Sequence, residues 1–199
     1  MRNYDNFGST PDIAEEEAFG KSRGERISRD EFLERRRMST KETVISEESE
    51  MAILRRIDTD QSFVTESGLV LSKGPSHPKT PLAKELKIRL EGAIESRGLN
   101  GKVKFYSAVK TYLDHLGVDA FIDIIGVDED TGEEFIIDTI TYDTSVIDKG
   151  GAHRADIGFQ YNGIDIKNES EKLTTIVDSL VTRSVSLLEL RKVLTRQQH

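Results

Sequence analysis

The sequence predicts an α+β domain over residues 80–199, preceded by a polar arm over residues 1–79. Three changes of pattern along the chain indicate this division. Apolar residues follow a helical period just after residue 80, change to strand-like segments near residue 118, and return to a helical period from about residue 168. Before residue 80 apolar residues are sparse, so the folded core is expected to lie downstream.

The arm is recognised by its charge pattern. Charges of both signs alternate along residues 15–37, and such a stretch buries too little apolar surface to offset the entropy lost on folding. We therefore expect a disordered arm with few contacts to its own domain. Short helices are expected near residues 30–37, after a capping box at Ser28, and near residues 47–57, after Ser46. Residues 62–72 can add a strand to a sheet edge.

The domain begins after GPSHPKTP, which carries three prolines and a glycine. Thr80 is a suitable cap for a helix that has Pro81 in its first position, and apolar residues continue at helical spacing to Ile94. A second helix is expected over residues 103–115, ended by Gly117.

Four strands and a long helix are expected to follow. Residues 118–127 and 133–142 are rich in β-branched and aromatic residues and are joined by the turn sequence DEDTG, which predicts a hairpin. This hairpin is apolar on both faces and therefore central. Residues 155–161 and 163–167 predict a second hairpin around Asn162-Gly163. The result is a small mixed sheet of two β-hairpins, packed with two preceding helices and a long C-terminal helix.

Composition excludes several classes of function. The chain carries 28 Lys and Arg against 36 Asp and Glu, a formal net charge of -8, and an acidic surface repels nucleic acid. There are no cysteines, so disulfides, thiolate zinc sites and cysteine nucleophiles are excluded. The N-terminus lacks the apolar run of a signal peptide, and no segment is apolar enough to span a membrane. We expect a cytoplasmic or virion protein with no membrane partner.

Two acids in the first hairpin are the candidate site. In the simplest register Asp123 stands directly opposite Asp138, with Cβ atoms about 5 Å apart. Two carboxylates at that distance repel unless a cation or a shared proton lies between them, and oxygen ligands of this kind suit Mg²⁺ or Mn²⁺. Two alternatives remain open. A one-residue shift of register removes the pair, or the acids are solvated or paired with an arginine.

A helix followed by a hairpin with Asp123 on its first strand and Asp138 on its second resembles the PD-(D/E)xK nuclease fold. The resemblance implies that these two acids hold a metal ion and that Glu91, on the preceding helix, supplies a third acid. Ile140 stands where that family has its catalytic lysine, and no proline precedes Asp123. The pattern therefore departs from the family at the residue that assists the nucleophile.

A second match to the same motif combines Asp156 with Asp165 and Lys167. It includes the lysine, but a two-residue turn at Asn162-Gly163 separates the two acids by about 13 Å along the strands. That distance is too long for one shared metal ion.

Two functions follow from these observations. The first is a non-enzymatic binding and assembly protein, without a cofactor, whose arm engages protein subunits of a larger complex, such as a virus or phage particle, and which can form oligomers. The second is a metal-dependent nuclease of degenerate PD-(D/E)xK type that uses Mg²⁺ or Mn²⁺. The missing lysine and the acidic charge favour the first.

Overall fold

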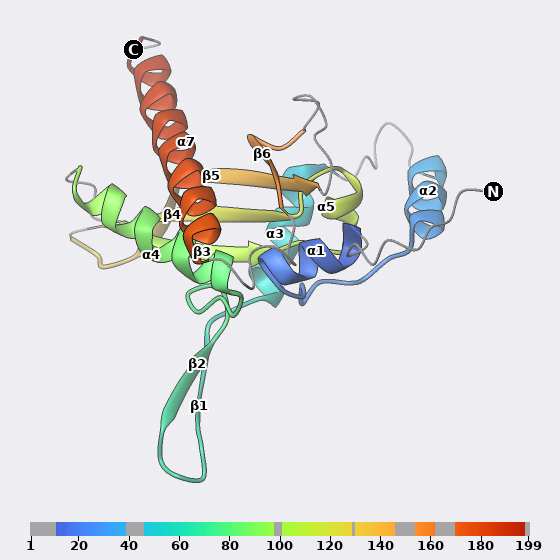
Figure 1. The fold of residues 1–199 in the computed structure, drawn as a ribbon, viewed down its shortest axis with the longest axis horizontal. Helices are drawn as coiled ribbons and strands as arrows, with labels where there is room; N and C mark the ends of the chain where they lie inside the picture. The colour runs from blue at the N-terminus through green and yellow to red at the C-terminus, as the bar shows by residue number, and fades with distance from the viewer. Residues whose placement is uncertain are drawn as a thin grey trace.

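The structure is a computed structural model and describes residues 11–38, 46–97, 101–128, 130–145, 154–161 and 170–197. Its centre is a four-stranded mixed sheet with the order β3-β4-β5-β6 (Figure 1). The strands are β3 (Gly101–Ser107), β4 (Ala120–Val127), β5 (Glu134–Ser145) and β6 (Ile157–Gln160). The first three are antiparallel, and β6 runs parallel to β5. Helices surround the sheet, so the predicted α+β class is confirmed.

Three helices cover one face of the sheet. They are α1 (Pro11–Phe19), α4 (Pro81–Glu95) and α7 (Ser170–Gln197), and α4 and α7 cross in front of the strands in Figure 1. As the sequence predicts, Thr80 caps α4, since its Oγ1 accepts a hydrogen bond of 3.3 Å from the Ala83 amide. Leu82, Leu86 and Leu90 are fully buried beneath α7 and against β3 and β4.

The other face is covered by α3 (Glu47–Ile57) and the short α5 (Tyr112–His115). Met51 and Leu54 of α3 pack against Phe121 of β4 and Tyr106 of β3. The two aromatic rings stack at 4.7 Å between centroids. Since β4 is buried on both faces, its predicted position at the centre of the sheet is confirmed. Beside α5, the helix α2 (Arg29–Met38) packs Phe32 against Tyr112.

The expectation that residues 1–79 make few contacts with the domain is wrong for the part that the structure describes. Ala18 and Phe19 belong to the main core, and the Ala18 and Gly20 carbonyls accept hydrogen bonds of 2.6 Å from Thr80 Oγ1 and Ser107 Oγ. The predicted short helices are present as α2 and α3. A few apolar residues suffice because each fills a sheet face that would otherwise face water. Residues 1–10 and 39–45 lie outside the described residues.

Residues 62–72 do not join the main sheet. Instead β1 (Gln61–Val64) and β2 (Val70–Lys73) form an antiparallel hairpin that extends away from the body of the molecule (Figure 1), and among the described strands each pairs with the other alone. We refer to residues 61–73 as the projecting hairpin.

The helix predicted over residues 103–115 is wrong in part. Residues 101–107 are a strand, because Val103 and Phe105 alternate with Lys102 and Lys104 and only the apolar pair enters the main core; the helix is confined to α5. The strand β6 pairs in parallel with β5, and its predicted antiparallel pairing with residues 163–167 stays a prediction. Residues 162–169, which include the second half of that predicted hairpin, lie outside the described residues.

Candidate functional site

Asp123 is buried in an ion pair. Its carboxylate accepts two hydrogen bonds of 2.7 Å from Arg55 of α3 and one of 2.8 Å from Thr139 Oγ1. Arg55 also lies over the ring of Phe121, 5.2 Å from its centroid. The hydrogen bonds to Asp123 raise the pKa of Arg55 above its ordinary value. Both carboxylate oxygens of Asp123 accept a hydrogen bond from the guanidinium, which stands on the side that a metal ion would approach.

Asp138 lies on the opposite face of the sheet. It pairs with Ile124 across the β4–β5 ladder, while Asp123 pairs with Thr139, so the register predicted for these acids is wrong by one residue, although it holds between the bulge and the turn. The ladder shifts between Ile124 and Ile125 at a bulge. Directly opposed residues share a face and neighbours along a strand do not, so the two carboxylates point to different faces.

Asp138 and Glu91 have partners of their own. Arg191 of α7 donates hydrogen bonds of 2.7 Å to Asp138 and 2.6 Å to Asp156. Glu91 accepts hydrogen bonds of 2.6 Å from Lys87 and 3.0 Å from the Val103 amide. The predicted three-acid metal site of Asp123, Asp138 and Glu91 is therefore not assembled. The alternative that the strand acids pair with arginines is the arrangement observed. Of the second motif, Asp165 and Lys167 lie outside the described residues.

A different group of acids does come together. Carboxylate oxygens of Glu15, Asp114 and Asp119 lie within 4.8 Å of one another. Asp119 is 2% exposed and accepts a 2.6 Å hydrogen bond from the Thr144 amide. Burial, reinforced by the charges of Glu15 and Asp114, raises the pKa of Asp119 well above its ordinary value. Oxygen ligands at this spacing suit a hard cation. Sequence reasoning could not find the group, because Glu15 of α1 lies far along the chain from Asp114 and Asp119.

These acids border a cavity of about 440 Å³ that also has basic walls. Arg36 of α2 and Arg154 line it together with Asp143 and His115. A cation would therefore enter a cavity of mixed charge, in which two guanidinium groups already offset part of the negative field.

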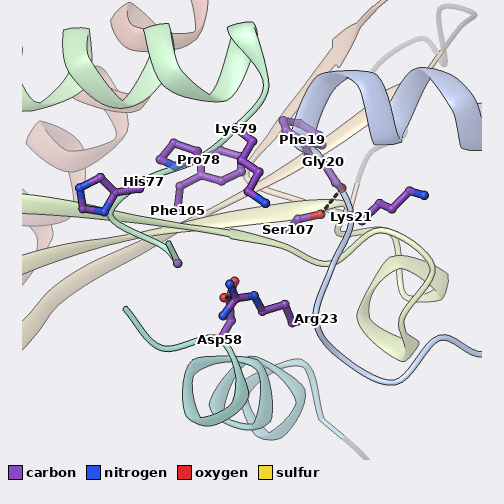
Figure 2. Close-up of a pocket in the computed structure, with 11 residues that line it drawn as sticks. Phe19, Gly20, Lys21, Arg23, Asp58, His77, Pro78, Lys79, Phe105 and Ser107 are labelled. Atoms are coloured by element: carbon purple, nitrogen blue, oxygen red, sulfur yellow. Dashed lines mark hydrogen bonds and ion pairs between the residues drawn. The ribbon is translucent and has the colours of Figure 1, made fainter. Parts of the chain in front are cut away.

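A second cavity, of about 260 Å³, lies where the projecting hairpin joins the domain (Figure 2). Phe19, Pro78 and Phe105 form its apolar side, and the Lys79 side chain extends into the space beneath them in Figure 2. Arg23 Nε lies 3.3 Å from Asp58 Oδ1, an ion pair without an aligned hydrogen bond. Burial raises the pKa of Asp58, and Arg23 opposes this effect.

A third cavity, of about 380 Å³, adjoins the second and shares His77, Pro78 and Lys79 with it. Its remaining walls come from Ser76 and from Lys84, Lys87 and Ile88 of α4. Ile88 is 62% exposed, so this cavity has an apolar patch with lysines around it. The spacing of residues 84, 87 and 88 places them on one helix face, a signal that the sequence already carries.

Comparisons with protein-family models, with curated proteins and with solved structures find no match for this chain. No helix in the described ranges has the length and apolar character that crossing a membrane requires. Function must therefore be inferred from the geometry above.

Proposed function

We propose that the chain is a non-enzymatic binding and assembly protein, and that the projecting hairpin is the element that contacts its protein partner. The observation that supports this proposal is the exposure of the hairpin's apolar side chains. Val64, Leu69 and Val70 are 66%, 59% and 61% exposed. Val64 and Val70 stand directly opposite each other and so share one face. Clustered apolar residues on a projecting element are typical of protein-binding surfaces.

The edges of the hairpin offer a second means of recognition. In the described part of the chain β1 and β2 pair with no strand of the main sheet. Their outer edges can therefore accept a partner strand through backbone hydrogen bonds, while the apolar face is buried against the partner. This mode needs neither a metal ion nor a catalytic group.

The base of the hairpin is fixed to the domain. Asp60 accepts hydrogen bonds of 2.9 Å and 2.8 Å from the amide and hydroxyl of Ser76, and the Pro75 carbonyl accepts one of 2.8 Å from the Phe105 amide. A fixed base limits the motion that binding must suppress, so less entropy is lost on association. The sequence indicated that an arm of residues 1–79 contacts the partner, and we now assign that contact to residues 61–73.

The test is a comparison of three full-length proteins: wild type, Val64→Asp/Val70→Asp, and the control Leu190→Asp, which alters a 57% exposed residue of α7. Each is expressed with a tag in the native host, and co-purifying proteins are quantified by mass spectrometry. Candidate partners are then purified and titrated by calorimetry. Sedimentation velocity of each variant tests self-association.

We expect one partner, or the chain itself, to bind the wild type and the control equally and the hairpin variant at least about tenfold more weakly, a difference of about 1.4 kcal/mol. Equal binding by all three proteins, with all three folded by circular dichroism, would overturn the proposal.

A further inference from the structure

We infer that the groove at the base of the projecting hairpin binds an acidic peptide segment that inserts an apolar side chain. The lysine groove is defined here as His77, Pro78, Lys79, Lys84, Lys87 and Ile88, the shared and outer walls of the two adjoining cavities. This inference rests on the proposed function, because it gives the chemistry of the protein partner. It does not depend on the hairpin being the main contact.

The charge of the groove is the first observation. Lys79 and Lys84 are exposed, and the structure shows neither in an ion pair with any residue that it describes. Lys87 is held by Glu91 at 2.6 Å. In a chain of net charge -8, two lysines without a counter-ion beside a third make a local positive region. The N-terminus of α4 at Pro81 adds its partial positive charge.

The apolar floor is the second observation. Ile88 lies on α4 beside the lysines and is 62% exposed, which is high for an aliphatic side chain. Pro78 lines both cavities. Burying such an aliphatic side chain against a ligand is favourable, because apolar surface is removed from water. An aliphatic or aromatic side chain of a ligand would cover Ile88, while flanking carboxylates would reach Lys79 and Lys84.

These two features together select among anions. Inorganic phosphate and the nucleic-acid backbone use positive charge but gain nothing from an aliphatic floor. A long polyanion would also meet the field of an acidic protein along the rest of its length. A peptide with a few Asp or Glu residues around a Leu, Ile or Phe uses both features over a short length.

The position of the groove links it to the hairpin. Gly74 follows the last residue of the hairpin directly, and its carbonyl accepts a hydrogen bond of 2.9 Å from the amide of His77 across the turn. A partner strand lying along β2 would continue from the hairpin onto α4, where the lysine groove begins. The groove can therefore fix the register of such a partner by charge.

The experiment selects peptides from a random 12-residue phage library on the immobilised full-length protein. Enriched peptides are synthesised, labelled with fluorescein and titrated by fluorescence polarisation. The variants are Lys79→Gln/Lys84→Gln, Ile88→Ser, and the control Lys102→Gln/Lys104→Gln, which removes two positive charges from β3. Two further ligands are tested. A fluorescein-labelled single-stranded DNA of 12 nucleotides is titrated in the same way, and inorganic phosphate is added as a competitor of the peptides.

We expect enriched peptides with at least two acids next to an apolar residue. Their affinity should fall about tenfold or more in Lys79→Gln/Lys84→Gln, fall also in Ile88→Ser, and stay unchanged in the control. The inference is overturned if no peptide is enriched, if the enriched peptides bind the groove variant as tightly as wild type, or if the DNA binds more tightly than the peptides with the same lysine dependence. The hairpin variant Val64→Asp/Val70→Asp should still bind these peptides, which separates this outcome from failure of the proposed function.

Discussion

Arg55 of α3 holds the carboxylate of Asp123 in β4 with two hydrogen bonds of 2.7 Å. The side chain of Asp123 is 1% exposed and that of Arg55 is 24% exposed. The pair joins a helix from the N-terminal third of the chain to the central strand of the sheet. It is also the feature that most clearly separates this structure from a metal site, since a guanidinium stands where a cation would have to bind.

The first prediction concerns this pair. Asp123→Asn should lower the free energy of unfolding by about 3–5 kcal/mol, because breaking a buried ion pair leaves one charge buried without a partner. Urea denaturation followed by circular dichroism measures the loss. Glu134→Gln is the control, since Glu134 pairs with Lys104 at a partly exposed position, and we expect a change below about 1 kcal/mol. Equal effects of the two substitutions would contradict the prediction.

The second prediction concerns the N-terminal segment. A fragment of residues 81–199 should not fold stably, because it lacks Ala18 and Phe19 on one sheet face and Met51 and Leu54 on the other. Each large apolar side chain contributes about 1.5–3 kcal/mol, which together approaches the stability of a small domain. Thermal unfolding and dye binding to exposed apolar surface test the fragment. In the full protein, a protease-resistant core beginning near Pro81 would show that α1 and α3 are dispensable.

The third prediction concerns pH. The folded-state pKa of Asp119 is raised, mainly by burial, so the stability it contributes is complete below its unfolded pKa of about 3.9 and is lost as pH rises through the folded value. Asp119→Asn should therefore gain stability relative to wild type as pH rises from 4 to 8. Urea denaturation of both proteins at several pH values measures the difference in their free energies of unfolding. Asp128→Asn is the comparison. Hydrogen bonds from Thr131 lower the pKa of Asp128, so the stability that Asp128 contributes is lost as pH falls. The pH dependence of this variant should therefore have the opposite sign.

The fourth prediction concerns the base of the hairpin. Gly74 has φ of 121°, and a Cβ there would lie 2.5 Å from the Thr59 carbonyl oxygen. Gly74→Ala should therefore displace the base and lower the free energy of unfolding by more than about 2 kcal/mol. Gly68→Ala, at φ of 78° with nothing within 4 Å of the added methyl, should cost only about 1 kcal/mol. Similar losses of stability for both variants in thermal unfolding would show that the backbone at the base shifts to accommodate the methyl group, contrary to the prediction.

The fifth prediction concerns nuclease activity. Wild type and Asp138→Asn should show the same background with single- and double-stranded DNA and RNA in Mg²⁺ or Mn²⁺. The reason is that Asp138 and Asp123 bind arginines on opposite faces of the sheet. Gel electrophoresis of labelled substrates checks this, and cleavage that disappears in Asp138→Asn would instead support the resemblance to the PD-(D/E)xK fold.

Local sequence signals were sufficient to predict those helices and strands whose conformation is determined by their own residues. The cap at Thr80 with Pro81, the helical period to Ile94 and the apolar strands around DEDTG all predicted what the structure contains. The sequence predicts a helix at residues 103–107, because Val103, Phe105 and their neighbours are too few to fix a period. Pairing with β4 decides their conformation instead.

The candidate site was predicted less well, for a different reason. Whether Asp123 faces Asp138 depends on one bulge in the β4–β5 ladder, and the turn sequence does not encode that bulge. The partner of Asp123 lies 68 residues away, at Arg55, in a segment whose charge pattern indicated an arm. The mean composition of residues 1–79 is polar, and it does not reveal the few apolar residues through which α1 and α3 pack against the sheet.

One sheet face is closed by helices from both ends of the chain, α1 and α7, which share a core with α4. During synthesis on a ribosome, α1 leaves the exit tunnel before β3 and β6, which carry Phe105 and Phe159, the ring partners of Phe19. The nascent chain must therefore keep Phe19 exposed until β6 has emerged, and these long-range contacts slow folding. A chaperone that shields apolar segments would act mainly on α1 during this interval, and a chain stalled before β6 would be a target for proteolysis.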